Sequence, residues 1–235
     1  MRSGGLTERS QCGFRNPRVV TYSRPNAWVR AWGAAAVIDY RLLGPIEAGV
    51  NGAGLDIGGQ KQRALLAILV LSANEPVPRD VLVDRLWGER PPPGAQHTLE
   101  VYISRLRKTL EPAAGRPVVL TSPGAYLLRA PADRVDVRCF ERLAEAGRRA
   151  LAENAPDRAA EDLKKALGLW RGAPLADVSD EPFAQPQIAR LNELRIGITE
   201  DRIEADLDSA ATPMSSASLA RWWRLIRCAS GCTSC

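Results

Sequence analysis

The chain has 235 residues, of which 45% are apolar and 25% charged, a composition typical of a globular protein with a hydrophobic core. Its longest apolar run, residues 64–73, has about half of the roughly 20 residues that a membrane span needs, so we expect no membrane partner. The chain has one histidine, and three of its five cysteines lie in the last eight residues. We therefore expect no zinc site, no disulfide framework and no cofactor.

The net charge of +5 is unevenly distributed along the chain. Residues 1–135 contain 18 Lys and Arg against 11 Asp and Glu, whereas residues 136–208 contain 11 against 16. A basic front and an acidic back indicate two modules with different partners. Residues 39–135 alone carry only two surplus positive charges, so bulk charge is weak evidence for nucleic-acid binding, and the placement of the basic side chains must decide.

Periodicity and composition divide the chain into four regions. Residues 1–37 have no sustained period and predict a disordered leader, with a start-site artefact as the alternative. Residues 38–130 and 136–208 are expected to form two domains. Residues 209–235 lose the helical pattern and predict an irregular tail, which suggests a truncation or a reading-frame change near residue 209.

The first predicted domain mixes strands and helices. Short strand-like segments separated by turn residues fill residues 39–59 and predict a small antiparallel sheet of about three strands. Residues 60–74 are apolar over much of the helical circumference, which predicts a buried central helix that ends before Glu75–Pro78. Two further helices and a hairpin are then expected, over residues 79–87, 95–111 and 118–128.

The predicted helix over residues 95–111 has two chemically different faces. One carries an apolar stripe at i, i+4, i+7 and i+11, which indicates the core: Leu99, Ile103, Leu106 and Leu110. The opposite face carries cations, hydroxyls and one small apolar side chain: His97, Thr98, Val101, Ser104, Arg105 and Lys108. Arg107 lies on the flank, and Glu100 is the nearest acid.

The outer face of this helix suits the major groove of DNA. Arginine can donate two hydrogen bonds to guanine, hydroxyls can bond base edges, and valine can contact a thymine methyl group. Lysine and a flanking arginine can neutralise phosphates and set the register. The alternative is an ordinary solvated helix face.

A short helix, a turn, a longer helix and a hairpin form the arrangement of a winged helix-turn-helix. Residues 39–130 resemble the OmpR-type winged-helix DNA-binding domain, through residues 65–69, 81–87, 98–108 and 121–128. More narrowly, residues 38–208 resemble the SARP-type regulators of antibiotic biosynthesis. Their bacterial transcriptional activator domain is matched by residues 170–177, 181–184 and 191–207.

The resemblance implies a fold and a function. The fold is an α+β winged helix-turn-helix with a small antiparallel sheet and a wing, followed by all-α tetratricopeptide-like helices. The function is that of a sequence-specific DNA-binding transcriptional regulator, an activator of a biosynthetic gene cluster that works in the bacterial cytoplasm at the nucleoid. The implied partners are double-stranded DNA with a direct-repeat operator, a second copy of the chain on that DNA, and RNA polymerase, which several relatives contact through the segment that corresponds to residues 88–94.

Site residues carry over by position from the family. Arg105 would read a base, and Thr98, Val101, Tyr102 and Ser104 would lie near bases or backbone, with His97 beside them. Arg107 and Lys108 would lie near phosphates. In the wing, Thr121 and Ser122 would approach the minor groove, but Ser122 stands where family wings often carry an arginine, so attraction to that groove should be weaker.

The back half has the spacing of one tetratricopeptide-like helix pair, and Gly147, Ala159 and Ala166 would permit close helix packing. An ordinary helical hairpin is the alternative. If the domain is truncated, the helix over residues 185–207 leaves an apolar face uncovered, through which the protein could dimerise or aggregate. Two alternative functions therefore stay open: an interaction adaptor, and a DNA binder that no longer activates. An enzyme is not expected, because the sequence has no phosphate-cradling glycine loop, metal-ligand spacing or catalytic triad.

Overall fold

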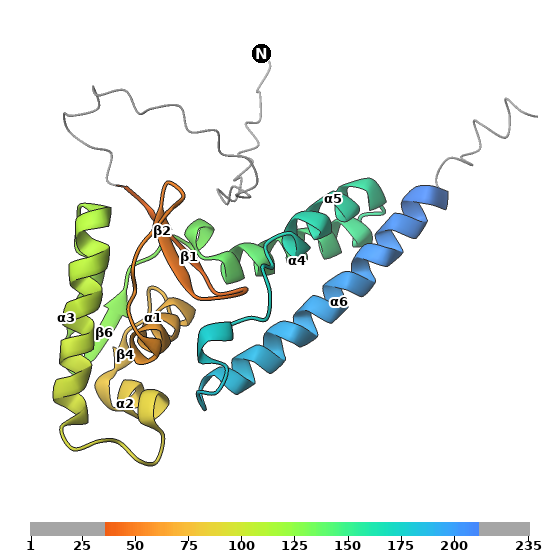
Figure 1. Cartoon of the computed structure of the whole chain (residues 1–235). Coiled ribbons are helices and arrows are strands. Elements are labelled where there is room, and N and C mark those ends of the chain that lie inside the picture. The colour runs from red at the N-terminus through yellow and green to blue at the C-terminus, as the bar shows by residue number, and fades with distance from the viewer. Residues whose placement is uncertain (1–35, 212–235) are drawn as a thin grey trace, which may run out of the picture. The chain divides into compact units, whose positions relative to one another are not determined.

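The computed structural model describes residues 36–211. The predicted leader up to residue 35, and the predicted tail from residue 212 onward, lie outside the described residues. The described chain forms two compact units, one of residues 36–142 and 168–194 and the other of residues 143–167 and 195–211. The predicted fold class is confirmed, since small antiparallel sheets and three helices precede a helical region (Figure 1).

Helix α1 (Gln60–Leu71) is the centre of the first unit. All seven residues of 64–70 have no solvent exposure. Helices α2 (Arg79–Trp87) and α3 (Ala95–Ala114) contact it, as does the last strand of the wing. Because neighbours cover residues 64–70 on all sides, this part of the helix has no polar face, as the apolar run of the sequence predicts.

Two three-stranded antiparallel sheets flank this helix. The first has the order β1 (Ile38–Arg41), β2 (Glu47–Val50), β3 (Ala53–Gly54). The second is the wing, in which β6 (Ala125–Leu128) lies between β5 (Val119–Ser122) and β4 (Val77–Pro78).

Strand β4 is not anticipated by the sequence, which reads residues 75–78 only as the end of a helix. It is two residues long, too short for any alternation to show. It exists because Val77 pairs with Tyr126 and Pro78 with Ala125 in the hairpin. Pro78 has no amide hydrogen to donate, and β4 is an edge strand, the position in a sheet that tolerates proline.

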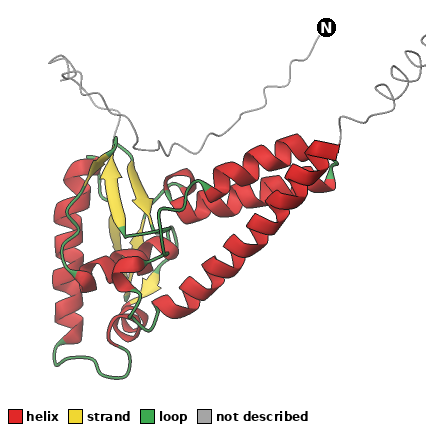
Figure 2. Ribbon diagram, turned by 45° about the vertical axis from the view of Figure 1, so that its right-hand side comes forward, coloured by secondary structure: helices red, strands yellow, loops and turns green. Residues whose placement is uncertain are grey.

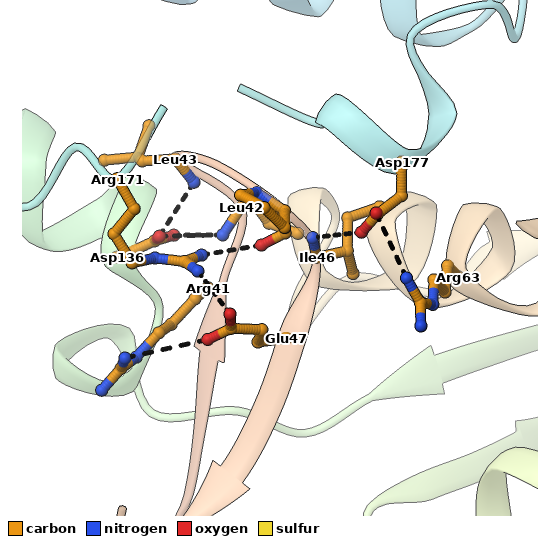
Figure 3. A network of polar contacts seen from close by, with 10 residues as sticks. Arg41, Leu42, Leu43, Ile46, Glu47, Arg63, Asp136, Arg171 and Asp177 are labelled. Carbon is orange, nitrogen blue, oxygen red and sulfur yellow. Dashed lines mark hydrogen bonds and ion pairs between the residues drawn. The ribbon is translucent and has the colours of Figure 1, made fainter. Parts of the chain in front are cut away.

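The loop between β1 and β2 is held by a buried carboxylate at the start of α4 (Asp136–Ala152) (Figure 3). The amides of Leu42 and Leu43 donate to the Asp136 carboxylate at 2.8 and 2.9 Å. Further along the loop, the amide of Ile46 donates to Asp177 at 2.7 Å, and Asp177 also forms an ion pair with Arg63 of α1 at 3.2 Å.

Backbone contacts reinforce this junction. The carbonyl of Leu43 accepts from the amide of Arg171 at 2.8 Å, and the Arg171 guanidinium donates to the Pro45 carbonyl at 2.7 Å (Figure 3). Gly44 has φ +155°, and a Cβ built there would lie 3.0 Å from the Cβ of Arg171. Glycine therefore allows the close approach of the two segments.

This junction explains why the compact units differ from the domains expected from the sequence. Sequence composition places a boundary between residues 130 and 136. In the structure, residues 136–142 and 168–194 belong to the same compact unit as the winged helix. The reason is that two carboxylates of the later segment, those of Asp136 and Asp177, accept hydrogen bonds from amides of the β1–β2 loop.

The second unit is helical. It contains the later part of α4, most of α5 (Pro156–Leu167) and the later part of α6 (Ala184–Ala211). A Cβ on Gly147 would lie 2.5 Å from the Leu163 side chain, so α4 and α5 contact each other closely at this glycine, as the small residue predicts. Arg148 of α4 forms an ion pair with Asp201 of α6 at 2.6 Å.

Helix α6 carries apolar residues on two sides within this unit. Ile198 and Ala205 are buried, whereas Ile196, Ile203 and Leu207 are 61%, 56% and 66% exposed. The exposed three lie on the side of the helix opposite the buried pair. Among the residues that the structure describes, none covers this apolar stripe.

Several helix ends differ from the sequence prediction. Helix α1 ends at Leu71 rather than at residue 74, α6 continues to Ala211, and two further ends show the cause. Helix α3 continues to Ala114, past Pro112, which lies in its last turn, and ends at Gly115 with φ +65°. The sequence pattern predicts a helix over residues 156–170, but α5 ends at Leu167, and Trp170 beyond it packs edge-on against Phe140 with ring centroids 5.4 Å apart. In both cases local packing at the helix end, which periodicity does not report, decides the boundary.

The buried Asp136 predicts a pH-dependent stability. Burial raises the pKa of Asp136 to about 6, against the opposing effect of the amides of Leu43 and Leu42 and the charge of Arg171. The folded protein therefore holds this proton more tightly than the unfolded chain, whose carboxyl titrates near pH 3.8. The stability that this group contributes is present below pH 3.8 and is lost as the pH rises to about 6.

We expect the free energy of unfolding of the wild type, minus that of Asp136→Asn, to fall by about 2 kcal/mol between pH 4.5 and pH 7. Urea titrations of both proteins at several pH values measure this difference, in which the other groups cancel. A difference that is constant across this range would show that Asp136 is ionised in the folded protein throughout.

Candidate nucleic-acid interface

The two faces of α3 are separated in the structure as the sequence predicts. Leu99, Ile103, Leu106 and Leu110 are at most 1% exposed and hold the helix against the core. On the other face His97, Ser104, Arg105 and Lys108 are exposed, and Thr98 and Val101 are half-buried. In both ribbon views α3 lies at the margin of the first unit, with the strands on one side of it (Figures 1 and 2).

Arg105 and Lys108 are the two cations of this exposed face. Within residues 36–211 neither forms a hydrogen bond or an ion pair. A cation that has no partner in the protein keeps its full charge available to an anion outside it. The face they share with Ser104 can therefore attract a polyanion and donate hydrogen bonds to it.

Tyr102 takes a different position from the one expected near bases or backbone. Its ring stacks on that of Trp87 at the end of α2, with centroids 6.3 Å apart and planes 18° apart. The pair joins the two helices of the helix-turn-helix. Tyr102 is half-buried, so most of its surface contributes to packing.

Arg107 and Thr121, both predicted as separate site residues, are bonded to each other. The Arg107 Nε donates to the Val119 carbonyl at 2.9 Å, and its Nη2 donates to the Thr121 hydroxyl at 2.7 Å. Both acceptors lie on β5, so the side chain joins α3 to the first strand of the wing. The guanidinium predicted to meet a phosphate thus has two partners within the protein.

Arg79, at the start of α2, is a residue of this region that the sequence analysis missed. Its guanidinium forms an ion pair with Glu100 at 3.4 Å and lies over the Tyr126 ring, 5.1 Å from the centroid. Its amide donates to the Gly124 carbonyl in the wing turn at 2.9 Å. Arg79 neutralises the acid nearest to the outer face of α3.

One sequence signal could have identified Arg79. A cation in the first helical turn opposes the helix dipole, so an arginine directly after Pro78 suggests a partner elsewhere in the fold. The identity of that partner depends on the tertiary structure, because Glu100 and Tyr126 are 21 and 47 positions further along the chain.

The wing presents its turn and the end of β5 to solvent. Thr121 is exposed and Ser122 half-buried, and Gly124 adopts φ +71° in the turn. At its other end the wing is fixed to the turn after α1, where Asn74 donates to the Ala130 carbonyl at 2.7 Å and accepts from the Ala130 amide at 3.2 Å. The wing is therefore anchored at its base by Asn74 and at its turn by the amide of Arg79.

Between residues 36 and 211, no group of three or more His, Cys, Asp or Glu residues could hold a metal ion. No helix in that range combines the length and the apolar composition needed to cross a membrane.

Two family models match the chain. The model of the transcriptional regulatory protein C-terminal domain matches residues 57–126, and that of the bacterial transcriptional activator domain matches residues 135–228. The second match extends beyond residue 208, where the sequence analysis places the end of that domain.

Named regulators are similar to the chain over most of its length. Regulatory protein DnrI of Streptomyces peucetius is 39% identical over 173 residues, which cover 71% of this chain and 64% of DnrI. Regulatory protein AfsR of Streptomyces coelicolor is 37% identical over 193 residues, 82% of this chain but 19% of AfsR. The chain thus spans less than two thirds of the length of these relatives.

A solved structure shares the fold. Mycobacterium tuberculosis EmbR, in complex with a low-affinity phosphopeptide, matches with a TM-score of 0.71 and 35% identity over 81% of this chain and 50% of that chain. With both domain types present in the order expected, this chain belongs to the SARP-type family of transcriptional regulators, in which an OmpR-type winged helix precedes a bacterial transcriptional activator domain.

Proposed function

We propose that this chain is a sequence-specific DNA-binding regulator that inserts α3 into the major groove. The observation that carries the proposal is the exposed face of α3, on which Arg105 and Lys108 have no partner in the described protein while the opposite face is buried. A helix held this firmly can present its side chains to base edges in one register.

Each residue of this face has an expected role. Arg105 donates to guanine, Ser104 and Thr98 bond base edges or phosphates, and Val101 contacts a thymine methyl group. Lys108 and His97 lie near the backbone. Thr121 and Ser122 of the wing approach the minor groove, where Ser122 supplies a hydroxyl in place of a charge.

Further parts of the proposal come from the family. DnrI and AfsR are named as regulatory proteins, and we infer that this chain activates a biosynthetic gene cluster, in the cytoplasm at the nucleoid. We infer that two copies bind adjacent half-sites of a direct repeat. The loop of residues 88–94 is largely exposed and contains three prolines, which suits a contact with RNA polymerase.

A second candidate function is that of a protein-interaction adaptor. The apolar stripe of Ile196, Ile203 and Leu207 favours it, because exposed apolar patches mark protein contacts. The two functions separate in one assay, since an adaptor would not shift DNA from promoters that neighbour its gene.

Arg105 and Lys108 are expected to differ in their effect on DNA binding. Once footprinting has identified an operator, Arg105→Ala should weaken binding to it by about 1–3 kcal/mol and leave binding to random DNA nearly unchanged. Lys108→Ala should weaken binding to both DNAs alike. It should also lower the slope of log binding constant against log salt concentration by about one.

Fluorescence anisotropy at several salt concentrations measures these effects, and Arg149→Ala, an exposed arginine of the second unit, serves as the matched control. Equal losses on operator and random DNA for Arg105→Ala would remove the base-reading role from this residue.

We propose that Arg107 positions the wing. Arg107→Gln removes both hydrogen bonds to β5, and Thr121→Val removes only the one at the hydroxyl. We expect amide hydrogen exchange in residues 119–122 to accelerate about fivefold to tenfold in Arg107→Gln, because a hydrogen bond from a charged group contributes about 1 kcal/mol or more, and to accelerate less in Thr121→Val.

The experiment compares hydrogen exchange by mass spectrometry with DNA affinity. Unchanged exchange together with weaker DNA binding in Arg107→Gln would instead support the phosphate contact that the sequence suggests for this residue.

A further inference from the structure

Glu181 carries one of the two carboxylates that are buried in the described part of the chain, the other being that of Asp136. The side chain of Glu181 is 8% exposed, and its carboxylate forms an ion pair with the Lys61 ammonium of α1 at 2.8 Å. Within residues 36–211 this carboxylate has no other hydrogen-bond or ion-pair partner. Because a buried charge is costly unless it is paired, the position of Glu181 depends on Lys61.

Lys61 shares its ammonium group between this carboxylate and the end of α2. Its Nζ donates to the Leu86 carbonyl, in the last turn of that helix, at 2.6 Å. The last carbonyls of a helix have no amide partner within the helix and carry partial negative charge, so an ammonium group both satisfies and stabilises them. The carboxylate of Glu181 thus holds a cation at the end of α2.

These contacts join the two domains of the family within the first compact unit. Lys61 and Leu86 lie in the range matched by the transcriptional regulatory C-terminal model, and Glu181 lies in the range matched by the activator-domain model. Lys61 and Glu181 are 120 positions apart in the chain. The activator-domain sequence therefore supplies a buried charged group to the winged helix.

The end of α2 is connected in turn to α3. The Leu86 carbonyl belongs to the peptide group that joins Leu86 to Trp87, and the Trp87 ring stacks on Tyr102 of α3. A continuous series of contacts thus leads from Glu181 through Lys61 and the end of α2 to α3. Contacts to base edges need side chains placed to within about 0.5 Å, so a small shift of the end of α2 is enough to disturb them.

We propose that Glu181 is a positioning residue for DNA recognition, which acts through Lys61 on the end of α2 and thereby on the orientation of α3. The carboxylate keeps the ammonium group at the Leu86 carbonyl, and this carbonyl keeps Trp87 against Tyr102. The inference rests on the proposed function, since it gives the activator-domain sequence a part in the DNA contact made by α3.

The first test compares the full chain with Glu181→Gln, which removes the charge and keeps the shape of the side chain. We expect operator binding to weaken about tenfold, as for the loss of one base contact, and binding to random DNA, which depends mainly on phosphates, to change less than about twofold. Fluorescence anisotropy measures both affinities. A variant that is only less stable would lose both in proportion to its folded fraction, so the operator-to-random ratio separates positioning from stability.

Further variants check the route of the effect. In a Lys61→Met background, adding Glu181→Gln should change the operator-to-random ratio by no more than about twofold, because the intermediate contact is already lost. Glu193→Gln, an exposed glutamate of the same compact unit without an ion pair in the described residues, is the matched control and should leave the ratio unchanged.

Hydrogen exchange measures the effect on α2 without DNA. The amide of Gly88 donates to the Asp84 carbonyl at the end of α2 at 2.7 Å, and its exchange should accelerate about fivefold in Glu181→Gln, while exchange in the wing strands stays unchanged. If Lys61→Met fails to fold because it leaves a buried carboxylate unpaired, this measurement and the affinity ratio of Glu181→Gln decide.

An unchanged operator-to-random ratio in Glu181→Gln, or unchanged exchange at Gly88, would overturn the positioning role and leave the proposed function intact. A wild-type chain that prefers no DNA sequence would contradict the proposed function itself, and this inference with it.

Discussion

The capture of the β1–β2 loop by Asp136 is the contact on which the first unit depends. Three main-chain donors, the amides of Leu42, Leu43 and Val137, converge on one carboxylate that burial removes from water. A buried acceptor with several donors makes each of them costly to lose. This one side chain therefore joins the first sheet to the segment that follows the wing. As a result, the start of the activator domain belongs to the same compact unit as the winged helix.

The same logic governs the helix that we assign to DNA. Burial of one face of α3 against α1 fixes its rotation, and two contacts fix its neighbours. Tyr102 stacks on Trp87 of α2, and Arg107 bonds β5 of the wing. Two residues that look like DNA contacts in the sequence thus have partners within the protein. Arg105 and Lys108 are exposed and unpaired among the described residues, which is why we propose them, and not Arg107, as the DNA contacts.

Local patterns predict most of the fold. Short-range periodicity and turn residues are enough to predict helices α1, α2 and α3 and the wing hairpin. The features that sequence analysis misses depend on distant partners. Strand β4 is two residues that become a strand only beside Tyr126, and Asp136 acts on amides more than 90 positions earlier in the chain. The exposure of Arg105 could be predicted from its place on a helical wheel, but the two bonds of Arg107 depend on the position of β5.

The bare cations of α3 have a kinetic consequence. A surface arginine that is paired with an internal carboxylate attracts a polyanion less strongly, because the two opposite charges largely cancel at a distance. Arg79 neutralises Glu100, and among residues 36–211 Arg105 and Lys108 have no carboxylate partner. Encounter with a duplex should therefore be accelerated by long-range attraction, and the acceleration should fall as salt screens the charges.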